Sequence, residues 1–349
     1  MGLGANVAVS VGAATPFAVA GWGIAAPARV VTNAELETTL DTSDEWIRSR
    51  SGIVSRRWAG PGETTAALAA EAAATALKRA GRTPDELGLV ILATSTPDQP
   101  LPQGAAAVCD LLGADCGGFD VHGACTGYVH ALLAGAGLVA SAPGPVLVVG
   151  SERMSAIVDP DERSTTVLFG DGAGALLLER PDVTAATAPG LVAWDAGTDG
   201  ALRSMLEVPE GDRYLRMVGG EVFRKAVRVI VESGEAVLAS VGVRGADVDV
   251  FVPHQANCRI IEAARARLGI AEACTVVDVA DWGNTSAASI PIALATAAEQ
   301  GRLHDGDLVL TAGFGAGMTW ASALLRWSSH PLAAPDDDQP TTTPRSDDR

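Results

Sequence analysis

Cys125 stands where a short strand-like run, "GGFDV", gives way to a long apolar run typical of a buried helix. Backbone N–H groups at a helix start carry partial positive charge, so a thiol there is expected to have a lowered pKa and to react as a thiolate. The same N–H groups can stabilise the oxyanion that forms when a thiolate attacks a carbonyl. Taken alone, the position fits either a catalytic nucleophile or a small buried cysteine that packs a helix start.

Two further polar residues lie at comparable junctions. His254 follows the apolar run "VDVFVP", and Asn284 follows a glycine just before a helix-like run. Ligands of α/β proteins bind at strand ends, where both side chains could donate hydrogen bonds. Each also has a simpler interpretation, His254 as a loop histidine and Asn284 as an ordinary turn residue. The Gly-rich segment 312–320 could likewise bring a backbone N–H to a substrate or be only a tight turn.

The elements that would position these residues occur in a repeated order. An amphipathic helix over 63–81 precedes a buried strand over 88–95, and a helix over 221–242 precedes a strand over 248–253. This order predicts an α/β protein made of two similar halves with buried strands covered by helices. The predicted divisions are a loose N-terminal leader (1–16), an N-terminal half (17–185), a C-terminal half (186–328) and a disordered acidic tail (329–349).

Composition excludes several classes of function. The net charge of -17 argues against a nucleic-acid partner, because phosphate binding needs a basic face. Five cysteines without CxxC or other paired spacing predict neither a disulfide framework nor a metal site. The apolar N-terminal segment lacks a basic region and is interrupted by Pro16, and no other run reaches spanning length. We therefore expect a cytoplasmic protein that does not enter membranes.

The segment "FGDGAGA" (169–175) has the glycine density of a phosphate loop but neither the P-loop signature nor GxGxxG. The longer stretch 164–180 is read as two short runs split by this Gly-rich turn. Its glycines predict close backbone packing in the middle of the fold rather than nucleotide binding.

Seven segments, in a fixed order, resemble the β-ketoacyl-acyl carrier protein synthase III family, the initiating condensing enzymes of dissociated fatty acid synthesis. They are "DTSDEWIRSRSGI" (41–53), "GACTG" (123–127), "ERSTTVLFGDGAGA" (162–175), "GGEVFRKAV" (219–227), "VPHQANCRII" (252–261), "GNTSAASIPIAL" (283–294) and "GFGAGMTW" (313–320). The resemblance implies a thiolase-like fold, in which two duplicated βαβ-type halves stack in five layers (α-β-α-β-α), usually as a homodimer.

The same resemblance implies roles for individual residues. Cys125 matches the acylated nucleophile, and His254 and Asn284 match the pair that drives malonyl decarboxylation. The backbone N–H groups of Cys125 and Ala316 match the oxyanion hole. Positions that match coenzyme A contacts are Trp46, Arg50, Arg163, Gly219, Asn257 and Phe314. Leu101 matches a residue that closes the acyl pocket across the dimer interface.

The implied reaction needs acyl-CoA and a malonyl-loaded acidic acyl carrier protein as substrates, and no metal or organic cofactor. Departures from the family pattern at His122–Ala124, Thr126 and Ala316 leave the starter acyl group open, and with it a role in polyketide priming. One alternative is an acyltransferase of the same fold that acts on an alcohol or amine. A second is a non-catalytic partner subunit, which the intact triad argues against.

Docking of an acidic carrier on an acidic chain requires a local basic face, because two negative bodies repel each other. Two predicted helices supply cationic residues whose family counterparts flank the tunnel mouth: Arg224, Lys225, Arg228, Arg259, Arg265 and Arg267. The alternative is that these are ordinary solvated charges.

Overall fold

In the computed structural model, which describes residues 15–181 and 188–329, two five-stranded sheets form the centre of the protein. The predicted leader as far as residue 14 and the predicted tail from residue 330 lie outside the described residues. The first sheet has the order β2 (Ala18–Ala25), β8 (Asp171–Glu179), β7 (Val146–Arg153), β5 (Leu89–Ala93) and β6 (Gly117–Val121). The second has the order β1 (Thr15–Pro16), β9 (Gly190–Thr198), β14 (Thr319–Arg326), β13 (Leu308–Gly315) and β12 (Val250–Pro253).

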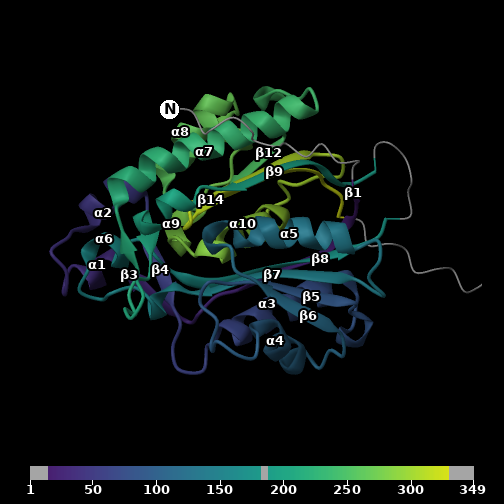
Figure 1. The fold of residues 1–349 in the computed structure, drawn as a ribbon, viewed down its shortest axis with the longest axis horizontal. Coiled ribbons are helices and arrows are strands. Elements are labelled where there is room, and N and C mark those ends of the chain that lie inside the picture. Colours follow the sequence, from purple (N-terminus) through teal and green to yellow (C-terminus); the bar gives the residue numbers. More distant parts are fainter. Residues whose placement is uncertain (1–14, 182–187, 330–349) are drawn as a thin grey trace, which may run out of the picture.

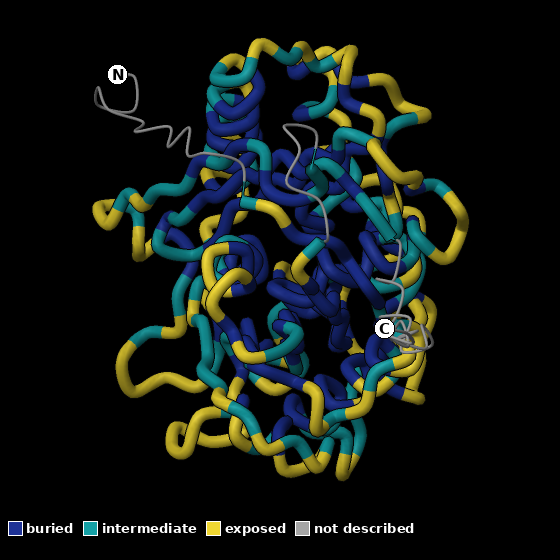
Figure 2. The backbone as a smooth tube through the Cα atoms, turned by 90° about the vertical axis from the view of Figure 1, so that its right-hand side faces the viewer, coloured by how far each residue is buried: buried dark blue, intermediate teal, exposed yellow. Residues whose placement is uncertain are grey.

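Helices cover both sheets and fill the space between them (Figure 1). Helices α3 (Thr65–Ala80) and α4 (Gly104–Leu112) cover the outer face of the first sheet. Helices α5 (Gly127–Leu138) and α10 (Ser289–Glu299) lie between the sheets, and α7 (Gly219–Ser240) and α8 (Cys258–Leu268) cover the second. The layers therefore run α-β-α-β-α, as predicted, and Figure 2 shows buried residues concentrated in the interior and exposed ones in the outer loops.

Shorter elements complete the fold. They are α1 (Asn33–Leu36), α2 (Asp44–Ser51), α6 (Arg163–Thr166), α9 (Val279–Trp282), and the two-stranded sheets β3 (Arg29–Thr32) with β4 (Ser55–Trp58) and β10 (Leu206–Glu207) with β11 (Arg216–Met217). Figure 1 shows α1, α2, α6, β3 and β4 together at one end of the layers. Among residues 15–181 and 188–329, no helix combines the length and apolar composition that crossing a bilayer requires.

The last two residues of the predicted loose leader form a strand. Thr15 and Pro16 form β1, which pairs antiparallel with Leu191 and Gly190 of β9, in the sheet of the other half. Without β1 that edge of β9 would carry unpaired backbone groups, and the incoming chain satisfies some of them. The short length of the strand explains why residue pattern alone did not reveal it.

Helix α3 shows how small residues build the layers. Thr64 caps its start by accepting the Ala67 N–H at 3.1 Å, and Gly81 ends it in the left-handed conformation with φ 65°. Six of its nine buried residues are alanine. A Cβ placed on Gly21 or Gly23 of β2 would collide with the backbone of α3, so this helix packs directly on the strand.

The expected Gly-rich turn within 164–180 is absent, because β8 is one continuous buried strand from Asp171. The prediction of close packing is confirmed. A Cβ on Gly174 would lie 2.5 Å from the backbone N of Ile292 and 2.6 Å from the carbonyl carbon of Pro291, both in α10. The absence of side chains thus lets α10 lie directly on β8.

Gly174→Ala is expected to destabilise the protein by about 1–3 kcal/mol, because the added methyl group must push α10 off the strand. Urea unfolding followed by far-UV circular dichroism measures the change. Gly137→Ala is the matched control, since a Cβ there meets no atom within 4 Å. That control lies in α5 and should gain about 0.5–1 kcal/mol from helix propensity. Equal stability of the two variants would contradict the packing described.

Candidate active site

Cys125 lies in a single helical turn, Ala124–Thr126, that leads directly into α5. The turn packs on the Gly-rich loop after β13, since a Cβ on Gly315 would lie 2.8 Å from the Cys125 backbone N. The Thr126 hydroxyl lies 3.0 Å from the hydroxyl of Thr319, just beyond that loop. The loop therefore approaches the candidate nucleophile, as the sequence predicted.

His254 follows β12 and is completely buried. Its Nδ1 lies 2.6 Å from the Ser289 hydroxyl oxygen, which also accepts the Gln255 N–H at 3.3 Å. We assign the Ser289 hydroxyl as the donor to Nδ1, which is the arrangement that puts the ring hydrogen on Nε2. Nε2 is buried and has no hydrogen-bond partner in the described chain. Burial also lowers the pKa of His254 to about 3, so the ring is a neutral donor at pH 7.

Asn284 is held by its backbone and by one side of its amide. Its N–H donates to the Leu168 carbonyl at 2.8 Å, and its carbonyl accepts the Gly170 N–H at 3.0 Å. The side-chain oxygen accepts the Ser286 N–H at 2.9 Å. The side-chain NH₂ forms no hydrogen bond within the described chain and can donate to a ligand.

The three side chains meet at one cavity of about 500 Å³. Its wall also contains five of the six predicted coenzyme A contacts, namely Trp46, Arg50, Gly219, Asn257 and Phe314. The sixth, Arg163, lies outside the wall, but its guanidinium is 4.8 Å from the Trp46 ring centroid. The Arg50 guanidinium is 5.8 Å from the same ring, so an aromatic surface between cations stands at the far end of the cavity.

Two predicted residues have further or different placements. Asn257 caps α8 by accepting the Arg259 N–H at 2.8 Å, and its amide nitrogen donates to the Arg50 carbonyl at 3.0 Å. Leu101 is 82% exposed and lines neither cavity of the single chain. Its predicted role depends on a second chain and stays a prediction.

Comparisons with known proteins agree with this geometry. Two family models match the chain, 3-oxoacyl-[acyl-carrier-protein (ACP)] synthase III over residues 119–200 and its C-terminal part over residues 238–327. A β-ketoacyl-[acyl-carrier-protein] synthase III from Dinoroseobacter shibae is 47% identical over 318 residues, which cover 88% of this chain and 98% of that protein. One from Ruegeria is 46% identical over 317 residues, with the same coverage. The chain belongs to the β-ketoacyl-[acyl-carrier-protein] synthase III family.

Solved structures of the family have the same architecture. The synthase III of Aquifex aeolicus superposes with a TM-score of 0.85 at 40% identity, covering 89% of this chain and all of that one. The priming β-ketosynthase of the R1128 polyketide pathway gives a TM-score of 0.84 at 38% identity, covering 93% of this chain and all of that one. The predicted thiolase-like fold and acyltransferase class are confirmed.

The thiol of this synthase III does not have the lowered pKa that its place at a helix start predicted. The pKa of Cys125 is raised to about 12, mainly by burial; interaction with the Ser286 hydroxyl lowers it, and the buried Glu152 carboxylate contributes to the rise. Removal of water penalises the thiolate more than the helix terminus favours it. The cysteine is therefore a protonated thiol in the free protein and must lose its proton during reaction.

A second cavity of about 530 Å³ also reaches Cys125, and it shares Phe169 and Leu206 with the first. Its wall combines the predicted oxyanion-hole residue Ala316 with apolar side chains such as Met154 and Ile157, and it also includes His122, Arg203 and Glu207. Cys125 thus belongs to the walls of both cavities. The second cavity can receive an acyl chain while the first holds the group that delivers it.

Sequence reasoning missed three polar residues near the cysteine and histidine: Glu152, Ser286 and Ser289. The two serines follow Asn284 within "GNTSAAS", where they looked like helix-start residues. Glu152 offered a clearer signal, because it is a charged residue at the end of an otherwise apolar strand. Such a residue must be satisfied inside the protein.

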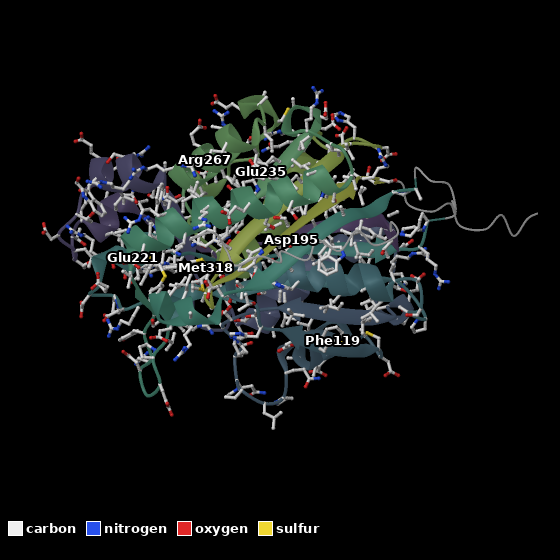
Figure 3. All side chains as sticks on the ribbon, turned by 45° about the horizontal axis from the view of Figure 1, so that its top comes forward. Phe119, Asp195, Glu221, Glu235, Arg267 and Met318 are labelled. Carbon is white, nitrogen blue, oxygen red and sulfur yellow. The ribbon has the colours of Figure 1, made fainter. Side chains whose placement is uncertain are left out.

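The six cationic residues predicted to dock a carrier fall into three groups. Arg224 and Arg259 line the first cavity. Arg228 and Arg265 form ion pairs with Glu232 at 2.7 Å and Glu262 at 2.6 Å, which reduces the positive charge expected from six cations. Lys225 and Arg267 line neither cavity. Figure 3 labels Arg267, Glu221 and Glu235, and the two glutamates show that α7 also presents acidic groups.

Neutral burial of His254 predicts a specific loss of stability in acid. The unfolded chain binds a proton at His254 near pH 6.5, whereas the folded chain resists it down to about pH 3, so falling pH favours unfolding. The stability advantage of the wild type over His254→Asn should fall by about 1.4 kcal/mol for each pH unit below about pH 6. Urea unfolding of both proteins at several pH values measures this difference. A difference that stays constant with pH would contradict a neutral, buried histidine.

Proposed function

We propose that the protein condenses an acyl-CoA starter with malonyl-acyl carrier protein through an acyl group held on Cys125. The observation that carries this proposal is the meeting, at one cavity, of a cysteine with two uncharged donors, the His254 Nε2–H and the Asn284 NH₂. The opposite end of the cavity supports coenzyme A as the donor. There Trp46 can stack on an adenine ring, and Arg50 and Arg224 can pair with phosphates.

In the first half-reaction, the Cys125 sulfur attacks the thioester carbon and the coenzyme A thiolate leaves. The carbonyl oxygen becomes negative in the transition state. The backbone N–H groups of Cys125 and Ala316 are the proposed donors to that oxygen, because the loop that carries Ala316 packs against the cysteine turn.

In the second half-reaction, loss of CO₂ from the malonyl group places negative charge on its thioester oxygen. His254 and Asn284 donate to that oxygen, and the resulting carbanion attacks the acyl-cysteine. Neutral donors suit this step, since the charge they stabilise appears only in the transition state. We propose no metal or organic cofactor, because the cysteine and these donors supply each step.

Intact-mass spectrometry and CO₂ release test these roles. An acyl-CoA should add one acyl mass to the wild type and none to Cys125→Ala. His254→Ala and Asn284→Ala should still be acylated but lose about two to four orders of magnitude in malonyl decarboxylation. Acylation at Cys109, Cys116, Cys258 or Cys274 would refute the assignment of the nucleophile. Acyl transfer to an alcohol or amine without CO₂ release would favour the alternative acyltransferase.

The starter group enters the second cavity in this proposal. Its apolar wall favours an aliphatic acyl chain. The likeness to the R1128 priming synthase keeps polyketide priming as the second candidate pathway. We place the enzyme in the cytoplasm as a homodimer. The five free cysteines are typical of a reducing compartment, and Leu101 is a large apolar side chain left exposed on the single chain.

An acidic carrier protein is proposed to dock on the outer surface of α7 and α8, next to the mouth of the first cavity. Lys225 and Arg267 test this surface best, because they lie on these helices but do not line the cavity that would hold coenzyme A. Lys225→Glu with Arg267→Glu should raise KM for malonyl-carrier protein several-fold, and the effect should shrink as salt rises. Acylation by acyl-CoA should be unchanged.

Lys78→Glu provides a control, because Lys78 is exposed on α3, in the opposite outer layer. It reverses a charge without changing the proposed docking surface. Steady-state kinetics of both half-reactions should find it indistinguishable from the wild type. An equal rise in KM for the control would mean that net charge alone, and not this surface, governs carrier binding.

A further inference from the structure

Glu152 is a buried acid that the proposed mechanism does not use. It lies near the end of β7, is 0% exposed, and has no cationic partner among the described residues. The neighbouring Arg153 guanidinium lies 3.7 Å from Asp98 instead. A buried carboxylate without a counter-ion is unfavourable unless donors satisfy it or a proton neutralises it.

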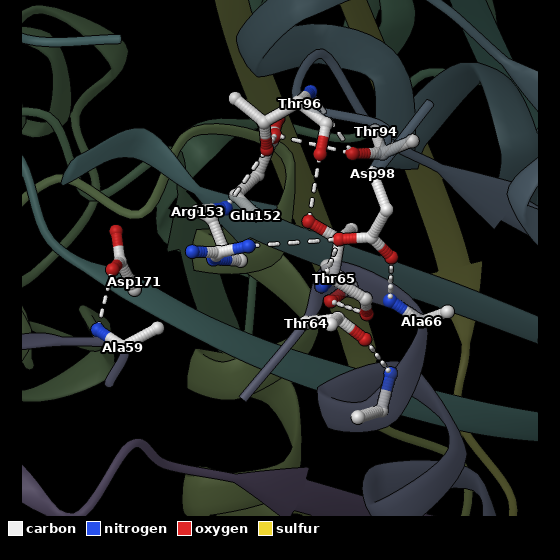
Figure 4. A network of polar contacts seen from close by, with 12 residues as sticks. Ala59, Thr64, Thr65, Ala66, Thr94, Thr96, Asp98, Glu152, Arg153 and Asp171 are labelled. Carbon is white, nitrogen blue, oxygen red and sulfur yellow. Dashed lines mark hydrogen bonds and ion pairs between the residues drawn. The ribbon is translucent and has the colours of Figure 1, made fainter. Parts of the chain in front are cut away.

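The surroundings of Glu152 are those of a proton acceptor (Figure 4). Its oxygens accept hydrogen bonds from the Ser95 N–H at 3.0 Å, the Ala287 N–H at 3.3 Å, the Thr96 hydroxyl at 2.6 Å and the Thr94 hydroxyl at 3.3 Å. Each threonine oxygen already accepts a backbone N–H, from Arg153 and from Thr96 respectively, so its hydrogen points to Glu152. The hydrogen-bond donors around Glu152 stabilise its ionised form. Burial acts in the opposite direction, because it raises the pKa of the carboxyl and so favours proton uptake.

Ser286 connects this acid to the nucleophile. Ser286 lines the second cavity together with Cys125, and the N–H of the next residue, Ala287, donates to Glu152 at 3.3 Å. The Ser286 hydroxyl lowers the pKa of both Cys125 and Glu152, and the residue is 2% exposed. Its backbone has φ 49°, a left-handed conformation that a serine adopts rarely, and its N–H is held by Asn284 at 2.9 Å. A hydroxyl both donates and accepts, so it can pass a proton from one side to the other.

His254 is not available for the same task. With the Ser289 hydroxyl assigned as the donor to Nδ1, the ring hydrogen lies on Nε2, and that atom donates to a ligand instead of taking up the thiol proton. Burial, which lowers the pKa of His254 to about 3, opposes a second ring proton. The charge of Glu152 raises the pKa of Cys125, whereas the Arg153 guanidinium lies 3.7 Å from Asp98.

We propose that Glu152 accepts the thiol proton of Cys125 through the Ser286 hydroxyl and holds it while the cysteine is substituted. The role in turnover rests on the proposed acylation of Cys125. As the S–H bond breaks and the S–C bond forms, the Ser286 oxygen takes the thiol proton and gives its own to Glu152. The coenzyme A thiolate takes a proton from solvent. After condensation the cysteine leaves as a thiolate, and Glu152 returns the proton along the same path.

Alkylation by iodoacetamide tests this without any acyl-CoA. Substitution of a thiol releases iodide and, ordinarily, one proton. In weakly buffered solution near pH 7, a pH-indicator dye counts protons, mass spectrometry counts modified Cys125, and Cys125→Ala gives the blank for the other cysteines. The wild type should release far less than one proton per Cys125 modified. Glu152→Gln, which keeps the size of the side chain, should release about one and should react roughly ten to a hundred times more slowly.

The alternatives give opposite results. Release of one proton per Cys125 by the wild type overturns the proposal, however the variants fold. Faster alkylation of Glu152→Gln also overturns it, because Glu152 would then act only by repelling the thiolate. Ser286→Ala should release about one proton, and retention of the proton in that variant would rule out the serine as the path. Since the probe needs no substrate, these outcomes are independent of whether acyl-CoA acylates the protein.

Discussion

Direct backbone contact between the first sheet and the segment that begins α10 is the constraint on which the site depends. No Cβ fits at Gly150 of β7 or Gly174 of β8, because each faces the backbone of residues 287–292. The contact places Ala287 against Glu152 and Ser286 in the same cavity wall as Cys125, and it places the Ser289 hydroxyl 2.6 Å from Nδ1 of His254. Four elements that are distant in sequence therefore share one small polar centre.

Exclusion of water is the second organising effect in this centre. Burial raises the pKa of Cys125, raises that of Glu152 and lowers that of His254, so each shift favours the uncharged form. A site of this kind stabilises charge only where oriented donors meet it. It also affects proton transfer, because burial disfavours the thiolate that must form at Cys125. The hydroxyl of Ser286 lies where such a transfer is needed.

The outer part of the site is charged and accessible to solvent. At the mouth of the first cavity, Trp46 is flanked by the guanidinium groups of Arg50 and Arg163, and Arg259 lies 5.3 Å from the Phe223 ring centroid. These groups reach solvent, so their charges are screened and their side chains can adapt to a ligand. The buried centre thus suits the chemical steps, and the charged, accessible mouth suits recognition of the ligand.

Local patterns were enough to predict many of the strands and helices and the placement of Cys125, His254 and Asn284 at element ends, but they missed β9, which lies in a stretch that reads as loop-rich. Strand runs and helix caps are set by neighbours in the sequence, and the motifs identified the family from the same residues. The tertiary structure decided what depends on distant neighbours. It reversed the expected pKa shift of Cys125, because desolvation by the surrounding layers outweighs the helix start. It also joined β1 to β9 and brought Glu152 to Ala287, 135 residues away. Pairing and desolvation are properties of the packed chain, so no window of sequence contains them.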